Sequence, residues 1–433
     1  MRIQFLLFAA LVSAFAGVSA MTIDVDKAVE IALENSEELR AAKNAVTQSK
    51  LDKKVARTAY LPNFSGSATG MCMLPDYEDM GMKLRMKGVY MAGISLQQPV
   101  FAGGRVVAAN RLAGIGARVA AERLRQTEIS VKANAETSYW SYVAVLSKVE
   151  MMRSYRAQVD TAYTMTRNAV DAGMATRNDL LRMEARRSQV IYQQEQVSGG
   201  ADLCRMALCD ALGLPYDTPI EVADTEIAEE IPAGLGIYDP EQRPEIRMMH
   251  ADIEAKEQQV RMTRADFLPQ LGLQAGWSAY GGVKMDMMTQ GPDGNYYPVS
   301  NKINGNSWSI MLGLQVPIFH WGEGINKVKR ARLDVENARL NLENNSRKLD
   351  LQVRQAVSNI RTGVELLRSA KDALTQAEAA LKSTTESYSL GMAPVTDLLD
   401  AQSQWHTARA SLTEARAQLR IHIVDYYAAT AQL

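Results

Sequence analysis

The chain repeats its own pattern, and this internal duplication limits the possible folds more than any other feature. The matching segments are AGMATRNDLL at 172–181 with LGMAPVTDLL at 390–399, QPVF at 98–101 with VPIF at 316–319, and Leu-Pro at 61–62 with Leu-Pro at 268–269. The matches occur in the same order, and the first two pairs have the same spacing. We therefore expect two structural repeats, residues 21–237 and 238–433.

Each repeat contains long proline-free stretches that favour helices. No proline lies between Pro99 and Pro215 or between Pro317 and Pro394, and such stretches, rich in Ala, Leu, Glu and Arg, form helices readily. The expected helices are 26–60, 105–171 and 178–212 in the first repeat and 240–267, 324–388 and 394–431 in the second. The long helices, each of about 65 residues and ~100 Å at 1.5 Å per residue, exceed any compact bundle. Two shorter helices stacked end to end would flank each long one. The Gly-Met segments would then be the turns of two helical hairpins.

Apolar residues in the second long stretch recur every seven positions. One row is Val353, Ile360, Leu367, Leu374 and Leu381. Rows of this kind are typical of coiled-coil packing. An ordinary soluble helical bundle would show them too, so the heptads alone do not decide between the two.

Four segments alternate between apolar and small or polar residues, as β-strands do. They lie at about 63–73, 88–98, 270–280 and 307–316. Strands of ~9–11 residues with one apolar face fit a transmembrane barrel. The alternative is a soluble sheet with one face on a core. The chain offers no other apolar partner for these faces, which favours the membrane. The connections 74–87 and 281–306, rich in Gly, Asp, Asn and Met, are expected to be external loops.

Four strands cannot close a barrel alone. Lipid does not tolerate open sheet edges, and membrane barrels have at least ~8 strands. The chain is therefore expected to oligomerise, as a dimer with a filled interior or as a trimer of 12 strands with a lumen.

The N-terminus has the pattern of a secretory signal peptide. Arg2 precedes the apolar run FLLFAALVSAFAGV, and Val18-Ser19-Ala20 forms a small-residue cleavage site, so residues 1–20 are assigned to the signal. No cysteine lies near the cut, and no lipid anchor is expected there. The three cysteines do not form a disulfide framework.

Composition excludes several classes of function. The chain has 48 basic and 49 acidic residues, so nothing points to a nucleic-acid partner. The four histidines, His250, His320, His406 and His422, are scattered. No nucleophile–base pairing, phosphate loop or metal-ligand spacing is present, so we expect no enzyme activity, no cofactor and no metal site.

With these motifs the chain resembles the TolC-type outer-membrane efflux proteins over essentially its whole mature length. The resemblance rests on the duplicated halves, the Leu-Pro entry into a strand, Pro-Ile-Phe-x-x-Gly before a long helix, and Tyr-Ser-x-Gly followed by Asp-Leu-Leu-Asp-Ala-Gln. It implies a mainly α fold with a membrane β-barrel portion, four barrel strands per chain, long coiled-coil α-hairpins, and a homotrimer. The trimer would form a 12-stranded barrel in outer-membrane lipid and an α-helical periplasmic tunnel.

The resemblance also implies a function and partners. The chain would be the passive exit channel of a tripartite system that exports small molecules such as drugs and toxic compounds. A periplasmic adaptor would dock to it, and an inner-membrane transporter of RND or ABC type would supply the energy. The same architecture could serve type I protein or peptide secretion. A non-conducting periplasmic coiled-coil scaffold is a third possibility, but it would lack the four strands.

The resemblance places four residues at a periplasmic gate. Asp397 and Asp400 match acidic residues that line the constriction of the tunnel, and Tyr388 and Asp179 match partners that hold the inner hairpin shut. Residues three apart share a helix face, and three-fold symmetry would gather these carboxylates around one axis and attract cations. Alternatively, Asp179 and Asp397 are helix-start residues stabilised by the helix dipole.

The hairpin turns are the expected adaptor contacts. They contain Gly173 and Met174 in the first repeat and Gly391 and Met392 in the second. Many drug-efflux members have a basic residue two positions after the glycine, where this chain has Ala175 and Ala393. These two positions therefore offer no ion-pair lock for the turns, although Arg177 could substitute on the first hairpin.

Methionines gather in two segments. The first contains Met71, Met73, Met80, Met82, Met86 and Met91, and the second contains Met285, Met287 and Met288. Thioethers suit Cu(I), but methionine also fills irregular space. Without a compact ligand set in the sequence, a metal cargo is disfavoured.

Overall fold

The computed structural model describes residues 21–79, 82–86, 88–224, 227 and 229–433. The expected signal peptide, residues 1–20, lies outside the described residues. None of the described helices combines the length and the apolar character needed to cross a membrane.

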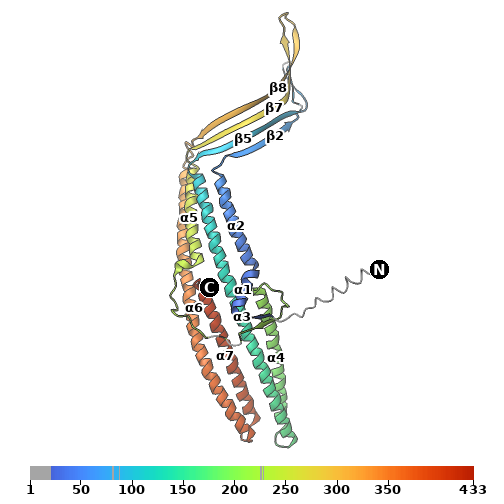
Figure 1. The fold of residues 1–433 in the computed structure, drawn as a ribbon, viewed down its shortest axis with the longest axis vertical. Helices are drawn as coiled ribbons and strands as arrows, with labels where there is room; N and C mark the ends of the chain where they lie inside the picture. Colours follow the sequence, from blue (N-terminus) through green and yellow to red (C-terminus); the bar gives the residue numbers. More distant parts are fainter. Residues whose placement is uncertain (1–20, 80–81, 87, 225–226, 228) are drawn as a thin grey trace, which may run out of the picture. The chain divides into compact units, whose positions relative to one another are not determined.

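Seven α-helices account for most of the described chain (Figure 1). They are α1 (Val25–Asn35), α2 (Glu37–Thr58), α3 (Arg105–Asp171), α4 (Arg177–Ala211), α5 (Pro244–Ala265), α6 (Glu323–Ser389) and α7 (Val395–Ala429). Corresponding helices of the two repeats have equal lengths: α3 and α6 have 67 residues, α4 and α7 have 35, and α2 and α5 have 22. This equality is what a duplicated fold requires.

The helix expected over 26–60 is in fact two helices, which corrects the sequence interpretation. Ser36 interrupts it with an extended ψ of 119°. The Ser36 hydroxyl accepts a hydrogen bond from the backbone N–H of Leu39 at 3.1 Å. Serine at this position therefore caps the start of α2, as N-cap residues do.

The long strands form one antiparallel sheet in the order β2 (Asn63–Met71), β5 (Val89–Ala102), β7 (Gln270–Gln290), β8 (Tyr296–Gln315). Of two short strands, β4 (Met82–Arg85) pairs with β7 beyond the end of β5, and β3 (Tyr77–Asp79) pairs with β4. Among the described residues, the outer edges of β2 and β8 have no strand partner.

The β7–β8 hairpin is much longer than expected. Residues 281–306, expected to be a loop, mostly extend both strands to a turn closed by a hydrogen bond from Gly291 N to the Asn295 carbonyl at 2.7 Å. The pairing shifts at a bulge between Tyr280 and Val283 and then continues. A bulge adds twist without ending the pairing of the two strands. The cross-strand hydrogen bonds hold these polar residues in an extended conformation.

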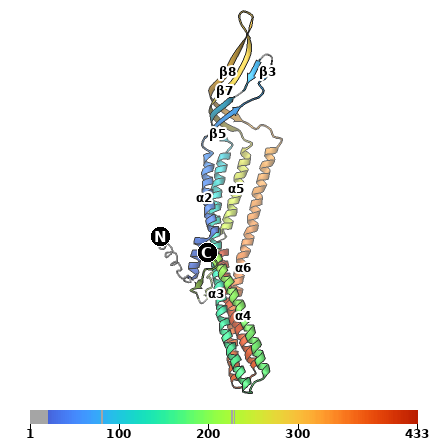
Figure 2. The ribbon, with the colours of Figure 1, turned by 90° about the vertical axis from the view of Figure 1, so that its right-hand side faces the viewer.

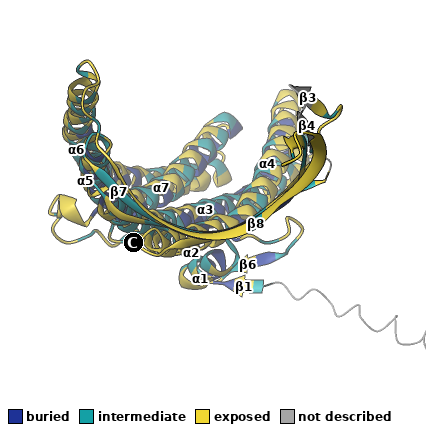
Figure 3. Cartoon of the chain, turned by 90° about the horizontal axis from the view of Figure 1, so that it is seen from above, coloured by how far each residue is buried: buried dark blue, intermediate teal, exposed yellow. Residues whose placement is uncertain are grey.

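The two faces of the sheet differ in chemistry. On one face, serine hydroxyls pair across strands, with Ser65 and Ser95 2.8 Å apart and Ser278 and Ser307 3.3 Å apart. The other face carries large apolar side chains such as Trp308 and Ile310, which are 83% and 81% exposed. Figure 3 shows that β8 is exposed along its length. An exposed apolar face of this size indicates contact with lipid or protein.

The described chain divides into two compact units. One comprises residues 21–44, 121–247 and 343–433, and the other comprises 45–120 and 248–342. Each unit takes segments from both sequence repeats, because the long helices α3 and α6 run through both units. The units therefore do not coincide with the repeats.

Within the first unit, the α3–α4 and α6–α7 hairpins lie side by side with their turns at the same end (Figures 1 and 2). A short parallel sheet of β1 (Met21–Ile23) and β6 (Ile220–Val222) packs at their core. The buried Tyr139 of α3 donates to Oδ2 of Asp224 at 2.6 Å, and its hydroxyl lies 3.2 Å from the Ile23 carbonyl oxygen. These contacts hold β1 and the connection between the repeats against α3.

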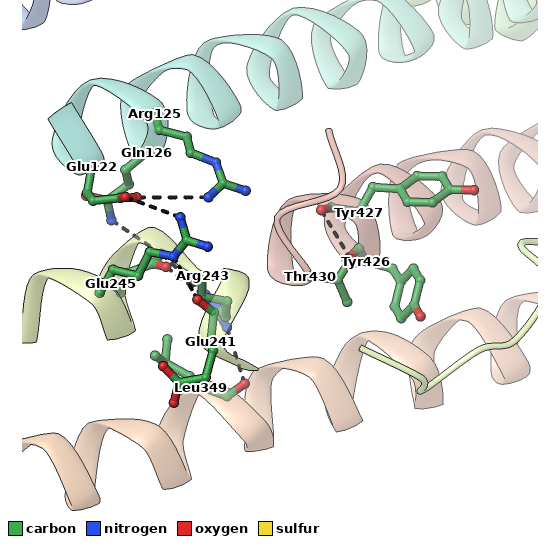
Figure 4. A network of polar contacts seen from close by, with 11 residues as sticks. Glu122, Arg125, Gln126, Glu241, Arg243, Glu245, Leu349, Tyr426, Tyr427 and Thr430 are labelled. Carbon is green, nitrogen blue, oxygen red and sulfur yellow. Dashed lines mark hydrogen bonds and ion pairs between the residues drawn. The ribbon is translucent and has the colours of Figure 1, made fainter. Parts of the chain in front are cut away.

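The segment before α5 is fixed by a buried charge (Figure 4). Arg243 is 4% exposed, and its guanidinium reaches both carboxylate oxygens of Glu245 at 3.3 Å and the Leu349 carbonyl at 3.4 Å. Glu245 also accepts from Gln126 of α3 at 3.3 Å. A buried cation costs little only when it is paired and hydrogen-bonded, and here these bonds join α3, α5 and α6. Gln126, Arg243 and Glu245 also line a cavity of about 520 Å³ beside the end of α7.

The connection between the repeats also attaches to the second hairpin. Glu229 pairs with Lys371 of α6 and with Arg416 of α7, the latter at 2.8 Å. These two cations lower the pKa of the Glu229 carboxyl. One carboxylate therefore links both helices of the hairpin.

Removal of the Tyr139 hydroxyl is expected to destabilise the first unit. Tyr139→Phe loses a buried hydrogen bond, which costs about 1 kcal/mol. The midpoint of denaturant unfolding of the purified protein should fall, whereas Tyr192→Phe, at an exposed position of α4, should leave it unchanged. Equal midpoints for the two variants would show that the bond to Asp224 contributes nothing to stability.

Candidate functional site

Both hairpin turns have the same backbone structure. Gly173 and Gly391 each have a φ of +73°, a conformation that glycine adopts without steric cost. Met174 N donates to the Ala169 carbonyl at 2.8 Å, and Met392 N donates to the Ser387 carbonyl at 2.9 Å. Together with the bonds of the glycine N–H groups three residues back, these form Schellman motifs. The two turns are thus equivalent ends of α3 and α6.

The turns present apolar side chains to solvent. Met174 is 80% exposed, Met392 is 71% exposed, and Leu390 is 70% exposed. A Cβ added at Gly173 or Gly391 would meet no atom within 4 Å. The exposed thioethers and leucine form a surface that a partner protein can cover.

The Asp179 carboxylate takes part in the N-terminal cap of its own helix, α4. Its carboxylate accepts from the Thr176 N–H at 3.1 Å and from the Thr176 hydroxyl at 2.7 Å, and the Thr176 hydroxyl accepts from Asp179 N at 3.2 Å. This is a capping box, and the Thr176 hydrogen bonds lower the pKa of Asp179. The structure does not bring Asp179 to Tyr388 within the described chain.

Tyr388 instead contacts the first hairpin through α3. It is half-buried, with its hydroxyl 3.5 Å from Oγ1 of Thr166. It also packs against an apolar cluster that includes Met183 of α4 and Val395 of α7. Tyr388 therefore joins the end of α6 to the α3–α4 hairpin.

Asp397 and Asp400 lie exposed at the start of α7. Asp397 N donates to the Pro394 carbonyl at 3.2 Å, and Pro394 supplies no side-chain cap. Within the part of the chain that the structure describes, neither carboxylate forms an ion pair. Both are therefore free to face solvent or another copy of the chain.

Sequence reasoning missed a buried polar cluster between α3 and α7. His406 lies with its ring centroid 3.5 Å from that of Tyr155, and both ring nitrogens lack a hydrogen-bond partner. Burial, with smaller contributions from Arg409 and Arg186, lowers the pKa of His406 to about 4. The signal was present in the sequence: Val395, Leu398, Gln402 and His406 follow helical spacing and all are buried.

The comparisons with known proteins identify the family. Residues 28–213 and 240–432 match the family described as outer membrane efflux protein. The chain belongs to this family. The resemblance found in the motifs is confirmed, as are the predicted mainly α fold with four long antiparallel strands per chain and the outer-membrane location.

Individual relatives are distant. The toluene efflux pump outer membrane protein TtgF of Pseudomonas putida is 24% identical over 71% of this chain and 61% of its own length. The alkaline protease secretion protein AprF of Pseudomonas aeruginosa is 22% identical over 93% of this chain and 82% of its own. The Campylobacter jejuni CmeC outer membrane channel superposes with a TM-score of 0.77 at 19% identity, covering 94% of this chain and 85% of that one. The chain thus spans about six tenths of the length of the efflux-pump relative.

Neutral burial of His406 predicts acid sensitivity. Its pKa is about 4 in the folded chain and ~6.5 when unfolded, so the unfolded state binds more protons between these values. The stabilising contribution is complete above pH 6.5 and is lost as the pH falls toward 4. We expect the unfolding midpoint to fall between pH 7 and pH 4.5, and to fall less in His406→Leu. The same change at exposed His320 is the control; if both variants keep the wild-type pH dependence, another group is responsible.

Proposed function

We propose that the chain is the outer-membrane exit channel of a tripartite efflux system. One observation carries this: a single chain joins an open-edged sheet with an exposed apolar face to two long helical hairpins with exposed turns. The first part suits a membrane and the second suits a partner across the periplasm. Membership of the outer membrane efflux protein family supports the same conclusion.

The working form is a homotrimer. The sheet of one chain has four long strands and two free edges, at β2 and β8. Free backbone N–H and C=O groups cost several kcal/mol each in lipid, so the edges must pair. Three copies, each joining its β8 to the β2 of the next, would close a 12-stranded barrel. The apolar face would contact lipid, and the serine-bearing face would line a water-filled lumen.

The gate lies where the hairpins end. In a trimer, Asp397 and Asp400 of three chains would form a ring of carboxylates, which favours cations. The contact of Tyr388 with Thr166 holds the α6–α7 hairpin against α3 and so favours the closed arrangement. Asp179 contributes by fixing the start of α4 through its capping box.

The hairpin turns are the docking surface for a periplasmic adaptor protein. Gly173, Met174, Gly391 and Met392 combine a fixed backbone with exposed thioethers. Methionine side chains are flexible and polarisable and suit adaptable protein contacts. The adaptor would join the channel to an inner-membrane transporter of RND or ABC type, which supplies the energy.

Small toxic molecules are the first candidate cargo, because TtgF is named for toluene efflux. Protein export is the second candidate, because the AprF alignment extends over 93% of this chain. A strain that lacks the protein distinguishes them. Accumulation of small apolar compounds with normal exoprotein levels supports efflux, and loss of a secreted protein with normal drug tolerance supports secretion.

Removal of the proposed ring should change ion selectivity. We expect Asp397→Asn with Asp400→Asn to lower the cation preference of single channels in planar bilayers, because six carboxylates would leave the lumen. The double variant Asp52→Asn with Asp202→Asn removes equal charge from exposed positions of α2 and α4 and should keep the preference. Unchanged selectivity in the first variant would place both residues outside the conducting path.

Loss of the Tyr388 hydroxyl should loosen the gate. Its distance of 3.5 Å from Thr166 Oγ1 indicates a weak contact, worth less than about 1 kcal/mol. Tyr388→Phe is therefore expected to raise the open probability of single channels a few-fold, while Tyr192→Phe on α4 does not. An open probability equal to the wild type would exclude Tyr388 from the closed state.

A further inference from the structure

Two methionine-rich segments far apart in the sequence meet at the end of the sheet that is remote from α2. The strand β4 pairs with β7 so that Leu84 lies opposite Met285 and Arg85 opposite Lys284. Met86 follows directly after β4. The pairing therefore brings the first methionine segment against the second, which no local signal in the sequence shows.

Met73 and Met86 lie side by side in the backbone. Met73 N donates to the Met86 carbonyl at 3.0 Å, just beyond the ends of β2 at Met71 and of β4 at Arg85. Met71 lies two residues before Met73, at the end of β2. Long side chains on neighbouring backbone segments are within reach of each other, so the thioethers of these three residues can converge.

Met285 completes the group from the other side. Met86 is two residues after Leu84, the residue opposite Met285, and it lies one residue beyond the end of β4. Residues in such diagonal positions are about 7–8 Å apart, within reach of long side chains. We call Met71, Met73, Met86 and Met285 the thioether group; all four belong to one chain.

Neither packing nor lipid contact explains these methionines. A methionine that fills space is buried, but Met71 is 46% exposed and Met73 is 43% exposed, while Met86 and Met285 are half-buried. Alternation along β2 places Met71 on the same face as Ser65, which pairs with Ser95. This is the polar face of the sheet. Met71 and Met73 are thus reachable from solvent, and Met71 lies on a surface where apolar side chains gain nothing.

The ligand chemistry selects a soft cation. Thioethers prefer Cu(I), whereas carboxylates and imidazoles suit harder metals. In the described part of the chain, no group of three or more His, Cys, Asp or Glu residues is placed to hold a metal. We propose that the thioether group binds one Cu(I)-class ion per chain, at the outer end of the polar face.

The site is tested by silver binding. Ag(I) serves as a redox-stable probe of the same soft class, titrated calorimetrically into the detergent-purified protein in chloride-free buffer after N-ethylmaleimide has blocked the accessible thiols. We expect one Ag(I) per chain. The triple variant Met73→Leu, Met86→Leu and Met285→Leu should weaken binding at least tenfold, because leucine keeps the volume but has no sulfur.

A matched control removes three methionines elsewhere. Met165→Leu, Met248→Leu and Met262→Leu combine one exposed and two half-buried positions on the helices, and this variant should bind Ag(I) like the wild type. A conductance and an unfolding midpoint equal to those of the wild type show that a variant is folded. If the triple variant does not fold, the single variant Met86→Leu replaces it, and the same tenfold loss of affinity is expected. Wild-type affinity in the folded site variant, an equal loss in the control, or equally tight binding of Zn(II) would each overturn the proposal. Because the readout is binding, its failure leaves the channel function untouched.

Discussion

Unpaired backbone groups at the two sheet edges govern the rest of the structure. A strand edge in lipid leaves N–H and C=O groups without water or a partner, so the sheet of one chain is not stable there alone. In the proposed trimer the sheet closes on copies of itself, so that the apolar face of β2, β5, β7 and β8 contacts lipid and the serine-bearing face contacts water. The proposed lumen, gate and docking surface all follow from that closure.

The helical part was predictable because its signals are local. Three features predicted the helices from short stretches of sequence. They are the absence of proline over 105–171 and 324–388, the repeated Gly-Met turns and the heptad rows. The break at Ser36 was missed because a helix tolerates a single serine. Only the hydrogen bond from Leu39 N–H to the Ser36 hydroxyl shows that this serine caps a new helix. Propensity alone does not distinguish a capping serine from a solvent-facing one.

The sheet and the polar sites were less predictable because they depend on residues distant in sequence. The polar stretch 281–306 resembles a loop, yet pairing of β7 with β8 makes most of it a strand. His406 is one of four histidines scattered along the sequence, and only the packing of α7 on α3 shows that it is buried beside Tyr155. The thioether group likewise exists through the β4–β7 register. The proposed roles of Asp397 and Asp400 depend on neighbouring copies of the chain, whose arrangement the sequence of one chain does not specify.

The identical Schellman closures at Gly173 and Gly391 have a consequence for assembly. Each chain offers two turns with the same backbone form, so a three-fold assembly would display six similar ends around its axis. The backbone would then have nearly six-fold symmetry at the turns. Only differing side chains, such as Thr176 in one turn and Pro394 in the other, would reduce the symmetry to three-fold. A partner that recognises the shared backbone can bind at every turn, and one that recognises the differing side chains binds at alternate ones. In such an assembly the duplicated hairpin would allow a choice of stoichiometry that a single hairpin per chain would not permit.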